Sequence, residues 1–311
     1  MAAGRPTYRH AVAAAGHTLA LGERPWLMGI LNASPDSFSD AGAHPSLDAR
    51  VQRARELIAQ GADLIDVGGE SAITNRPPVA VDDEIERVVP LVAALVGELG
   101  TIVSVDTYKP AVAQAAITAG AAIVNDVSGL RDPELADVCA HTGAALVLMH
   151  TRAAPKQRLQ DPRLYDDVVA DVVGFLSERL QLARSRGVQD EQIVLDPGPD
   201  FAKTPAQTVA VLRRLGELHA LGRPLLLAVS RKDFVGALTG AGPRERLGGT
   251  LAAIGFGVDA GAHVLRVHDV AATADFLAVR AALRGDRELG PTEGLTPERY
   301  PDGPPPGLSL G

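Results

Sequence analysis

Polar side chains that can bind a substrate recur at the ends of apolar runs throughout the sequence. The positions are Asn32, Asp66, Asp106, Asn125, His150, Asp196, Ser230, Lys232, Arg266 and His268. Carboxylates and a carboxamide in an apolar cup suit an aminopyrimidinone-like ring, whose N–H groups donate hydrogen bonds and whose carbonyl accepts them. We expect Asp106, Asn125 and Asp196 to bind such a ring. Lys232 would bind the ring carbonyl or a ring nitrogen and balance the acidic groups.

A second group suits an anion. Arg266 and His268 alternate along an apolar run, so both side chains point to the same side of a strand. Together with Asn32 they predict a clamp for a phosphate or diphosphate. Barrel enzymes often bind phosphate near their last strands.

The apolar runs alternate with helical segments, which is typical of a parallel α/β sheet. The runs cover residues 26–31, 64–67, 101–105, 121–125, 145–149, 193–196, 225–229 and 264–267. Eight such units predict a (β/α)8 barrel, whose strand ends meet at one rim and form the active site. A doubly wound sheet is the alternative architecture. Glycines at 61, 100, 120, 143 and 261 precede strands, where a left-handed helix end is expected.

We divide the chain into three parts. Residues 1–23 are expected to be an N-terminal segment that includes a possible barrel-closing hairpin, and residues 24–285 to form the barrel. Residues 286–311 are rich in proline and glycine and are expected to be an irregular tail.

Two structural explanations compete with a functional site. Asp, Asn and Ser side chains often cap the following helix, which could explain two or three of the polar strand ends. Capping does not explain Asp66, Lys232, Arg266 and His268 together. A salt-bridge network that merely closes the top of the barrel is the other structural explanation.

Composition narrows the possible functions. The net charge of −8 argues against a nucleic-acid partner, which would require a basic face. A single cysteine, Cys139, excludes an intrachain disulfide, and no apolar run reaches the ~18 residues that a membrane span needs. We therefore expect a cytoplasmic protein without membrane or nucleic-acid partners. P-loop, dinucleotide-binding, zinc-protease and serine-hydrolase motifs do not occur.

At these residues the sequence resembles the dihydropteroate synthase family. The matching segments are MGILNASPDSFSD (28–40), DVGGES (66–71), SVDTYKP (104–110), NDVSGL (125–130), LMH (148–150), DPG (196–198), SRK (230–232) and RVHDV (266–270). They span the whole predicted barrel in the family's order.

The resemblance implies condensation of 6-hydroxymethyl-7,8-dihydropterin diphosphate with 4-aminobenzoate, giving 7,8-dihydropteroate and pyrophosphate. The residues that it makes catalytic are Asp106, Lys232 and Asn32, with Asn32 also as the Mg²⁺ ligand. Those that it makes substrate-binding are Asp66, Arg76, Asp106, Asn125, Asp196, Lys232, Arg266, His268, Phe38, Phe201, Ser230 and Met149. Within that set Arg266 and His268 would hold the diphosphate. Phe38, Phe201 and Ser230 would border the aminobenzoate. The resemblance also implies a homodimer formed through helices near the end of the barrel.

Two loops depart from the family pattern. After GGES the family continues Thr-Arg-Pro-Gly, whereas this chain reads Ala-Ile-Thr-Asn-Arg-Pro-Pro, and we align Arg76 with the family's diphosphate-binding arginine. After DPG the family has Phe-Gly-Phe-Gly-Lys, and here Phe201 and Lys203 are retained while both glycines are replaced, by Asp200 and Ala202. Asp200 would either repel the carboxylate of 4-aminobenzoate or face solvent.

These departures leave other functions open. A diverged paralogue could bind the pterin and condense another amine, or catalyse weakly. A methyltransferase barrel acting on methyltetrahydrofolate would need no diphosphate clamp, so Arg266 and His268 argue against it. A non-catalytic pterin-binding barrel is the third alternative.

Overall fold

The computed structural model describes residues 8–34, 46–71 and 77–290. Within them, eight parallel strands lie in the order β8-β7-β6-β5-β4-β3-β10-β9. Their bounds are β3 (Trp26–Asn32), β4 (Leu64–Gly68), β5 (Ile102–Asp106), β6 (Ile123–Asp126), β7 (Ala145–Met149), β8 (Ile193–Asp196), β9 (Leu226–Leu227) and β10 (Val264–Val267). A parallel bridge between Leu195 and Leu225 joins the two ends of the sheet. The predicted barrel is confirmed, and the doubly wound alternative is wrong.

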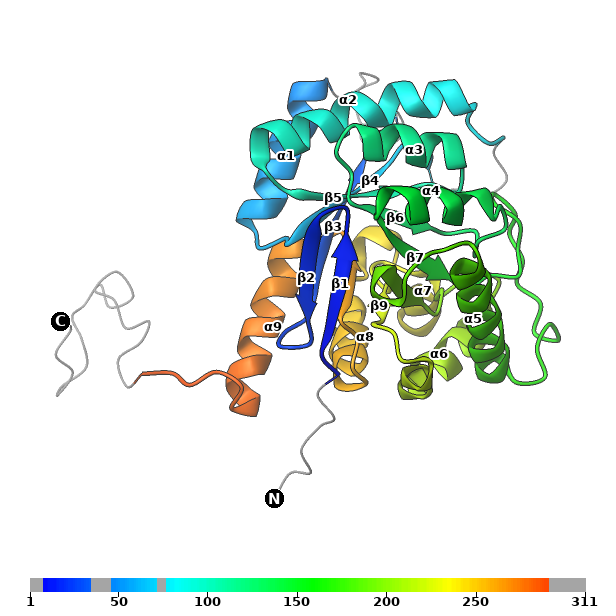
Figure 1. The fold of residues 1–311 in the computed structure, drawn as a ribbon. Coiled ribbons are helices and arrows are strands. Elements are labelled where there is room, and N and C mark those ends of the chain that lie inside the picture. The colour runs from blue at the N-terminus through cyan, green and yellow to red at the C-terminus, as the bar shows by residue number, and fades with distance from the viewer. Residues whose placement is uncertain (1–7, 35–45, 72–76, 291–311) are drawn as a thin grey trace, which may run out of the picture.

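Helices surround the strands, as Figure 1 shows. In the described residues the α-helices are α1 (Leu47–Ala59), α2 (Val81–Leu99), α3 (Pro110–Thr118), α4 (Glu134–Thr142), α5 (Val168–Ser185), α6 (Pro205–Arg213), α7 (Asp233–Thr239), α8 (Leu247–Asp259) and α9 (Val270–Arg284). Short 3-10 helices are η2 (Asp190–Gln192), η3 (Leu215–Leu221) and η4 (Pro243–Glu245). Each helix buries one face on the barrel; in α1 this face holds Val51, Ala54 and Leu57.

An antiparallel hairpin, β1 (His10–Ala14) and β2 (His17–Leu21), lies across one end of the barrel (Figure 1). Its inward side chains, such as Val12 and Leu19, are buried. They belong to one cluster with residues from the first halves of the barrel strands, such as Met28 and Val264. The hairpin therefore covers the amino-terminal end of the strands and leaves the opposite rim for the polar strand ends.

The glycines that follow several helices adopt the expected left-handed conformation. All five glycines that were expected to end helices, at 61, 100, 120, 143 and 261, have positive φ. Cys139 is buried in α4, and burial raises the pKa of its thiol to about 12, which suits a structural role. Among the described residues, no helix is long and apolar enough to cross a membrane.

Candidate active site

Arg266 connects the ends of three barrel strands. From β10 its Nε donates to Asp66 Oδ2 on β4 at 2.6 Å, and its Nη2 donates to Asp106 Oδ2 on β5 at 2.8 Å. Asp66 is fully buried. Burial raises the pKa of Asp106 to about 7, and the Arg266 charge opposes this shift. The structure thus places Arg266 among the residues predicted to bind the pterin ring.

Two further predicted ring-binding residues lie beside this cluster. Asn125 donates from Nδ2 to Asp66 Oδ2 at 3.3 Å, and both residues are buried. Asp196 accepts from the Gly198 N–H at 2.7 Å, and burial raises the pKa of its carboxyl. In the described residues, Asp66 Oδ1 and Asn125 Oδ1 have no hydrogen-bond partner. Each such buried acceptor costs about 1–3 kcal/mol unless something donates to it.

Lys232 and Phe201 are in contact. The Lys232 Nζ atom lies 4.2 Å from the centre of the Phe201 ring, a cation–π distance. Burial lowers the pKa of Lys232, and the Asp200 and Asp196 carboxylates oppose that shift. The structure thus brings together Lys232, which was predicted to bind the pterin, and Phe201, which was predicted to border the second substrate.

The Asp200 carboxylate has two hydrogen-bond donors within the protein. Its Oδ1 accepts from Thr208 Oγ1 at 3.0 Å, and its Oδ2 accepts from the Phe234 N–H at 3.2 Å. Phe234 is in the first turn of α7, whose N-cap residue makes no side-chain cap hydrogen bond of its own. The carboxylate is therefore used within the protein, at a helix start that favours negative charge.

His268 is paired with Ser230. The Ser230 Oγ lies 3.0 Å from His268 Nδ1 and accepts from the His268 N–H at 3.1 Å. Burial lowers the pKa of His268 to about 4, with Arg266 and Arg231 adding to the shift. At neutral pH His268 is therefore uncharged, and a neutral imidazole N–H can still donate to an anion. Ser230 thus contacts the expected anion clamp.

Asn32 stands at the end of β3, paired in register with Gly68 on β4, which is itself paired with Asp106 on β5. A Cβ at position 68 would lie 3.7 Å from Asp106 Cβ and 4.0 Å from Asn32 Oδ1, so both side chains lie near this strand end. The described residues contain no group of three or more His, Cys, Asp or Glu side chains arranged for a metal. The one oxygen of Asn32 fits Mg²⁺ only if substrate phosphates and water supply the other ligands, which is the usual arrangement for this ion.

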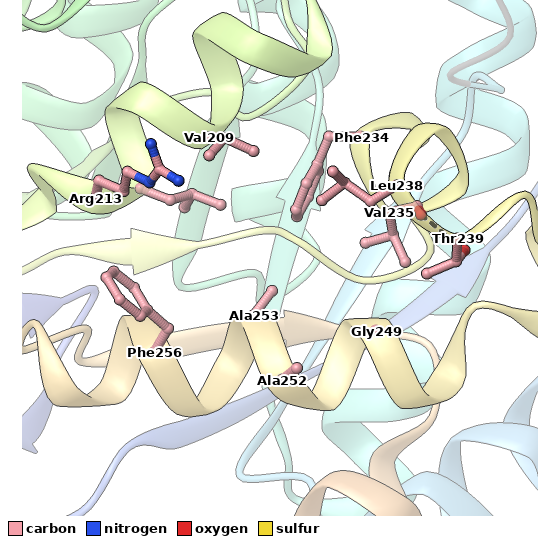
Figure 2. A pocket seen from close by; sticks show the side chains of 11 residues that line it. Val209, Arg213, Phe234, Val235, Leu238, Thr239, Gly249, Ala252, Ala253 and Phe256 are labelled. Atoms are coloured by element: carbon pink, nitrogen blue, oxygen red, sulfur yellow. Dashed lines mark hydrogen bonds between the residues drawn. The ribbon is translucent and has the colours of Figure 1, made fainter.

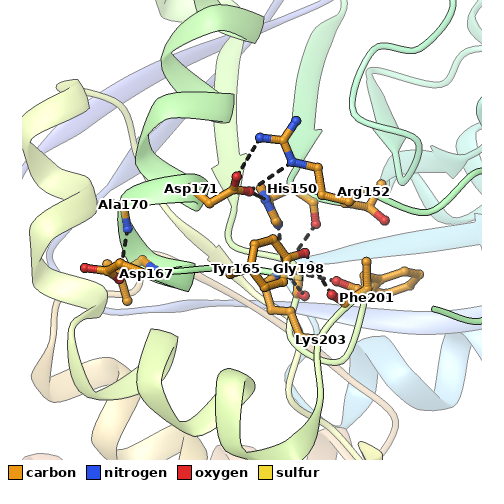
Figure 3. A network of polar contacts seen from close by, with 12 residues as sticks. His150, Arg152, Tyr165, Asp167, Ala170, Asp171, Gly198, Phe201 and Lys203 are labelled. Carbon is orange, nitrogen blue, oxygen red and sulfur yellow. Dashed lines mark hydrogen bonds and ion pairs between the residues drawn. The ribbon is translucent and has the colours of Figure 1, made fainter. Parts of the chain in front are cut away.

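A buried network fixes the loop between β8 and α6 (Figure 3). Lys203 is fully buried, and its Nζ donates to His150 Nδ1 at 2.7 Å, to Gly198 O at 2.9 Å and to Phe201 O at 3.1 Å. On its other side, His150 Nε2 lies 2.9 Å from Asp171 Oδ1 on α5. The sequence showed that this chain keeps the lysine of the family pattern at position 203, but it did not show that the side chain is buried. The match to that pattern was the only sign in the sequence that Lys203 is functional.

Glu70 holds both ends of the loop that follows β4. It pairs with Lys109 at 2.9 Å and with Lys156 at 3.3 Å, and it accepts from the Val79 N–H at 3.2 Å. Lys109 also pairs with the buried Glu84. This network fixes the described positions on either side of the residues that carry Arg76.

The remaining predicted site residues are Phe38, Arg76 and Met149. Phe38 and Arg76 lie outside the described residues. Met149 is buried at the end of β7, next to Gly198. Gly198 has a φ of +63°, and a Cβ there would lie 2.1 Å from His150 O, so only glycine fits.

Comparison with known proteins agrees with this geometry. The model of the pterin-binding enzyme family matches residues 28–268. Dihydropteroate synthase of Bacillus subtilis is 43% identical over 249 residues, which are 80% of this chain and 85% of the relative.

Solved structures give the same result. Xanthomonas albilineans dihydropteroate synthase with 4-aminobenzoic acid has a TM-score of 0.81 at 42% identity, covering 90% of this chain and 99% of the other. The Burkholderia cenocepacia enzyme complexed with 7,8-dihydropteroate has a TM-score of 0.80 at 40% identity, covering 89% and 97%. The pterin-binding match, the close relatives and the shared barrel together place this chain in the dihydropteroate synthase family, a family of transferases in folate synthesis.

Proposed function

We propose that this protein condenses 6-hydroxymethyl-7,8-dihydropterin diphosphate with 4-aminobenzoate, giving 7,8-dihydropteroate and pyrophosphate. The observation that carries the proposal is the pair of buried acceptors without partners, Asp66 Oδ1 and Asn125 Oδ1. The amino and ring N–H groups of a pterin are donors that match them. Asp106 and Asp196 extend the same acceptor set, and Lys232 is the donor for the ring carbonyl or a ring nitrogen.

The chemistry requires a leaving group and an amine rather than a protein nucleophile. The bond from the pterin methylene carbon to the diphosphate oxygen breaks, the arylamine nitrogen bonds to that carbon, and the amine loses a proton. Carboxylates around the ring, such as Asp106 and Asp196, stabilise positive charge on the pterin. His268 and Arg76 are proposed to hold the diphosphate together with the Nη1 group of Arg266, whose Nε and Nη2 bond Asp66 and Asp106. Positioning of the amine against the carbon then supplies much of the rate enhancement.

Mg²⁺ is the proposed metal, with Asn32 as its protein ligand. When bound, the ion neutralises negative charge that develops on the leaving diphosphate. Asn32 is suited to binding this Mg²⁺ ion because it lies at the rim near Asp106, on the strand next to β10.

The second substrate is proposed to lie against Phe201, Phe38 and Ser230. Asp200 does not argue against 4-aminobenzoate, because its carboxylate is bonded to Thr208 and to the start of α7. The alternative, a diverged paralogue that condenses another amine, rests on the altered loop after β4.

We also propose a homodimer formed through α6, α7 and α8. Between these helices lies an apolar cavity of about 280 Å³, which is lined by the residues drawn in Figure 2. Leu238 and Phe256 in its lining are 70% and 51% exposed. Large exposed apolar side chains gathered at one place indicate a protein interface. A cytoplasmic location is proposed because the only cysteine is a buried free thiol.

The first prediction concerns the reaction. We expect pyrophosphate release only when the dihydropterin diphosphate, 4-aminobenzoate and Mg²⁺ are all present, measured together with dihydropteroate by chromatography. Asp106→Asn removes a charged contact worth about 1.5–3 kcal/mol, so kcat/KM should fall roughly 10- to 150-fold. Asp190→Asn, at an exposed ion pair with Arg184, is the control and should stay within about twofold. Pyrophosphate release without dihydropteroate, or equal activity with Asp106→Asn, would contradict the proposal.

The second prediction concerns His268. Its pKa of about 4 should rise when magnesium pyrophosphate binds, because the anion favours the charged imidazole. Binding therefore takes up protons, and it should strengthen as the pH falls through the raised pKa toward about 4. NMR titration of the histidine ring signals measures this. His263, which also has a lowered pKa of about 4, contacts Tyr8 and Leu225 and should not respond. An unchanged His268 titration would remove it from the clamp.

The third prediction concerns assembly. Phe256→Glu places a charge in the cavity between α6, α7 and α8, so the solution mass should fall from two chains to one. Light scattering coupled to size-exclusion chromatography measures the mass. Leu283→Glu alters an 83% exposed side chain on α9, away from that cavity, and should leave the dimer intact. A wild-type monomer would disprove the dimer, and a dimer of Phe256→Glu would disprove its location.

A further inference from the structure

We propose that Lys203 is a positioning residue, which acts through the backbone of Phe201 to fix one wall of the pocket for the second substrate. The inference deepens the proposed function and rests on it for the identity of that substrate. It concerns the loop of residues 197–204 between β8 and α6, where this chain departs from the family pattern.

The first observation is the set of contacts made by the lysine. Its Nζ has three short acceptors: His150 Nδ1, Gly198 O and Phe201 O, at 2.7, 2.9 and 3.1 Å. Three acceptors match the three N–H bonds of the protonated ammonium. Burial lowers the pKa of Lys203 to about 7, and the Asp196 and Asp171 carboxylates oppose that shift. Because the side chain is fully buried, the ammonium is enclosed by protein (Figure 3). Its role is therefore to hold neighbouring groups in place.

The second observation is that the ammonium is itself held from outside the loop. The Asp171 carboxylate, whose pKa is lowered by its His150 and Arg152 partners, can only accept, so the proton of the neutral His150 imidazole is on Nε2, which lies 2.9 Å from Asp171 Oδ1. His150 Nδ1 is then the acceptor for Lys203. Arg152 pairs with the same carboxylate, at 2.6 Å between Nη2 and Oδ2. The relay thus runs from α5, through the end of β7, to the backbone of the loop.

The third observation is strain in the loop. Gly198, Asp200 and Ala202 all have positive φ, of 63°, 64° and 51°. For the two non-glycine residues this conformation costs about 1–2 kcal/mol each. Such a backbone persists only when surrounding contacts hold it. Lys203 binds the carbonyls of Gly198 and Phe201 on either side of Asp200, and Tyr165 OH donates to Ala202 O at 2.8 Å.

The consequence lies at the rim. The Phe201 carbonyl faces the buried ammonium, while its ring lies 4.2 Å from Lys232 Nζ. Fixing the carbonyl therefore fixes the backbone position from which the ring projects, and the contact with Lys232 orients the ring. Lys203 should affect the binding of the second substrate, which the ring borders, more than that of the pterin. Of the proposed pterin acceptors only Asp196 adjoins the loop, whereas Asp66, Asp106 and Asn125 stand on β4, β5 and β6.

The experiment measures the KM of each substrate separately. Lys203→Met keeps an unbranched stem and removes the ammonium, so the KM for 4-aminobenzoate should rise at least tenfold. The KM for the dihydropterin diphosphate should change by less than about threefold. Equal changes in both KM values, or in neither, would overturn the proposal.

Two variants of Asp171 test the same contacts without changing the buried Lys203. Asp171→Ala removes the acceptor of His150 and should raise the KM for 4-aminobenzoate in the same direction, whereas Asp171→Asn retains an acceptor and should stay within about twofold. The control is Asp167→Ala, one turn earlier at the N-cap of α5, which should lower stability without changing either KM. If Lys203→Met does not fold, the Asp171 pair decides the proposal.

A double-mutant cycle tests whether the effect passes through Phe201. Phe201→Ala alone should raise the KM for 4-aminobenzoate, and adding Lys203→Met should raise it by less than about twofold more. Additive effects would show that Lys203 acts by another route and would overturn the proposal.

Hydrogen exchange separates this proposal from the proposed function. The amides of residues 198–203 should exchange faster in Lys203→Met and Asp171→Ala than in the wild type and Asp171→Asn, whatever the substrate. If the wild type makes no dihydropteroate, the proposed function fails and exchange alone decides whether Lys203 orders the loop. Equal exchange in all four proteins would overturn the proposal.

Discussion

The candidate site depends on the position of the Arg266 guanidinium between Asp66 and Asp106. Asp66 is fully buried, and an unpaired carboxylate there would cost several kcal/mol. Arg266 stands on β10, next to β3, while the carboxylates stand on β4 and β5. The contact therefore passes over β3 on the inner face of the sheet and requires the sheet to be curved. It also leaves Asp66 Oδ1 and Asn125 Oδ1 as acceptors without a partner in the described residues, which is the condition for binding a donor-rich ring.

The loop after β8 shows how this chain tolerates the loss of two family glycines. Asp200 and Ala202 keep the left-handed conformation that glycine adopts freely. The Asp200 carboxylate then bonds to Thr208 and to the start of α7, and the Lys203 ammonium bonds to carbonyls within the loop. The replacement thus adds contacts that offset its own strain, and the carboxylate is directed away from the role that charge alone suggested.

Much of the fold follows from local sequence. The eight apolar runs predicted the strands to within about two residues at most ends, because strands buried on both faces need continuous apolar residues. The seventh run was too long, since only Leu226 and Leu227 form β9. The rim position of residues such as Asn32, Asp106 and Asp196 followed from parallel topology, which places every strand end on one side.

The partners of these side chains were decided only by the tertiary structure. Arg266 and Asp66 are 200 positions apart, and Lys203 and His150 are 53 apart, so no local spacing reveals either contact. Burial likewise depends on which elements pack together, as for Lys203, a residue type that is normally exposed. The sequence by itself determined which chemical groups reach the rim. The closed barrel decided which of them neutralise one another, because the range of hydrogen bonds and ion pairs is a few ångströms in space, whatever the separation along the chain.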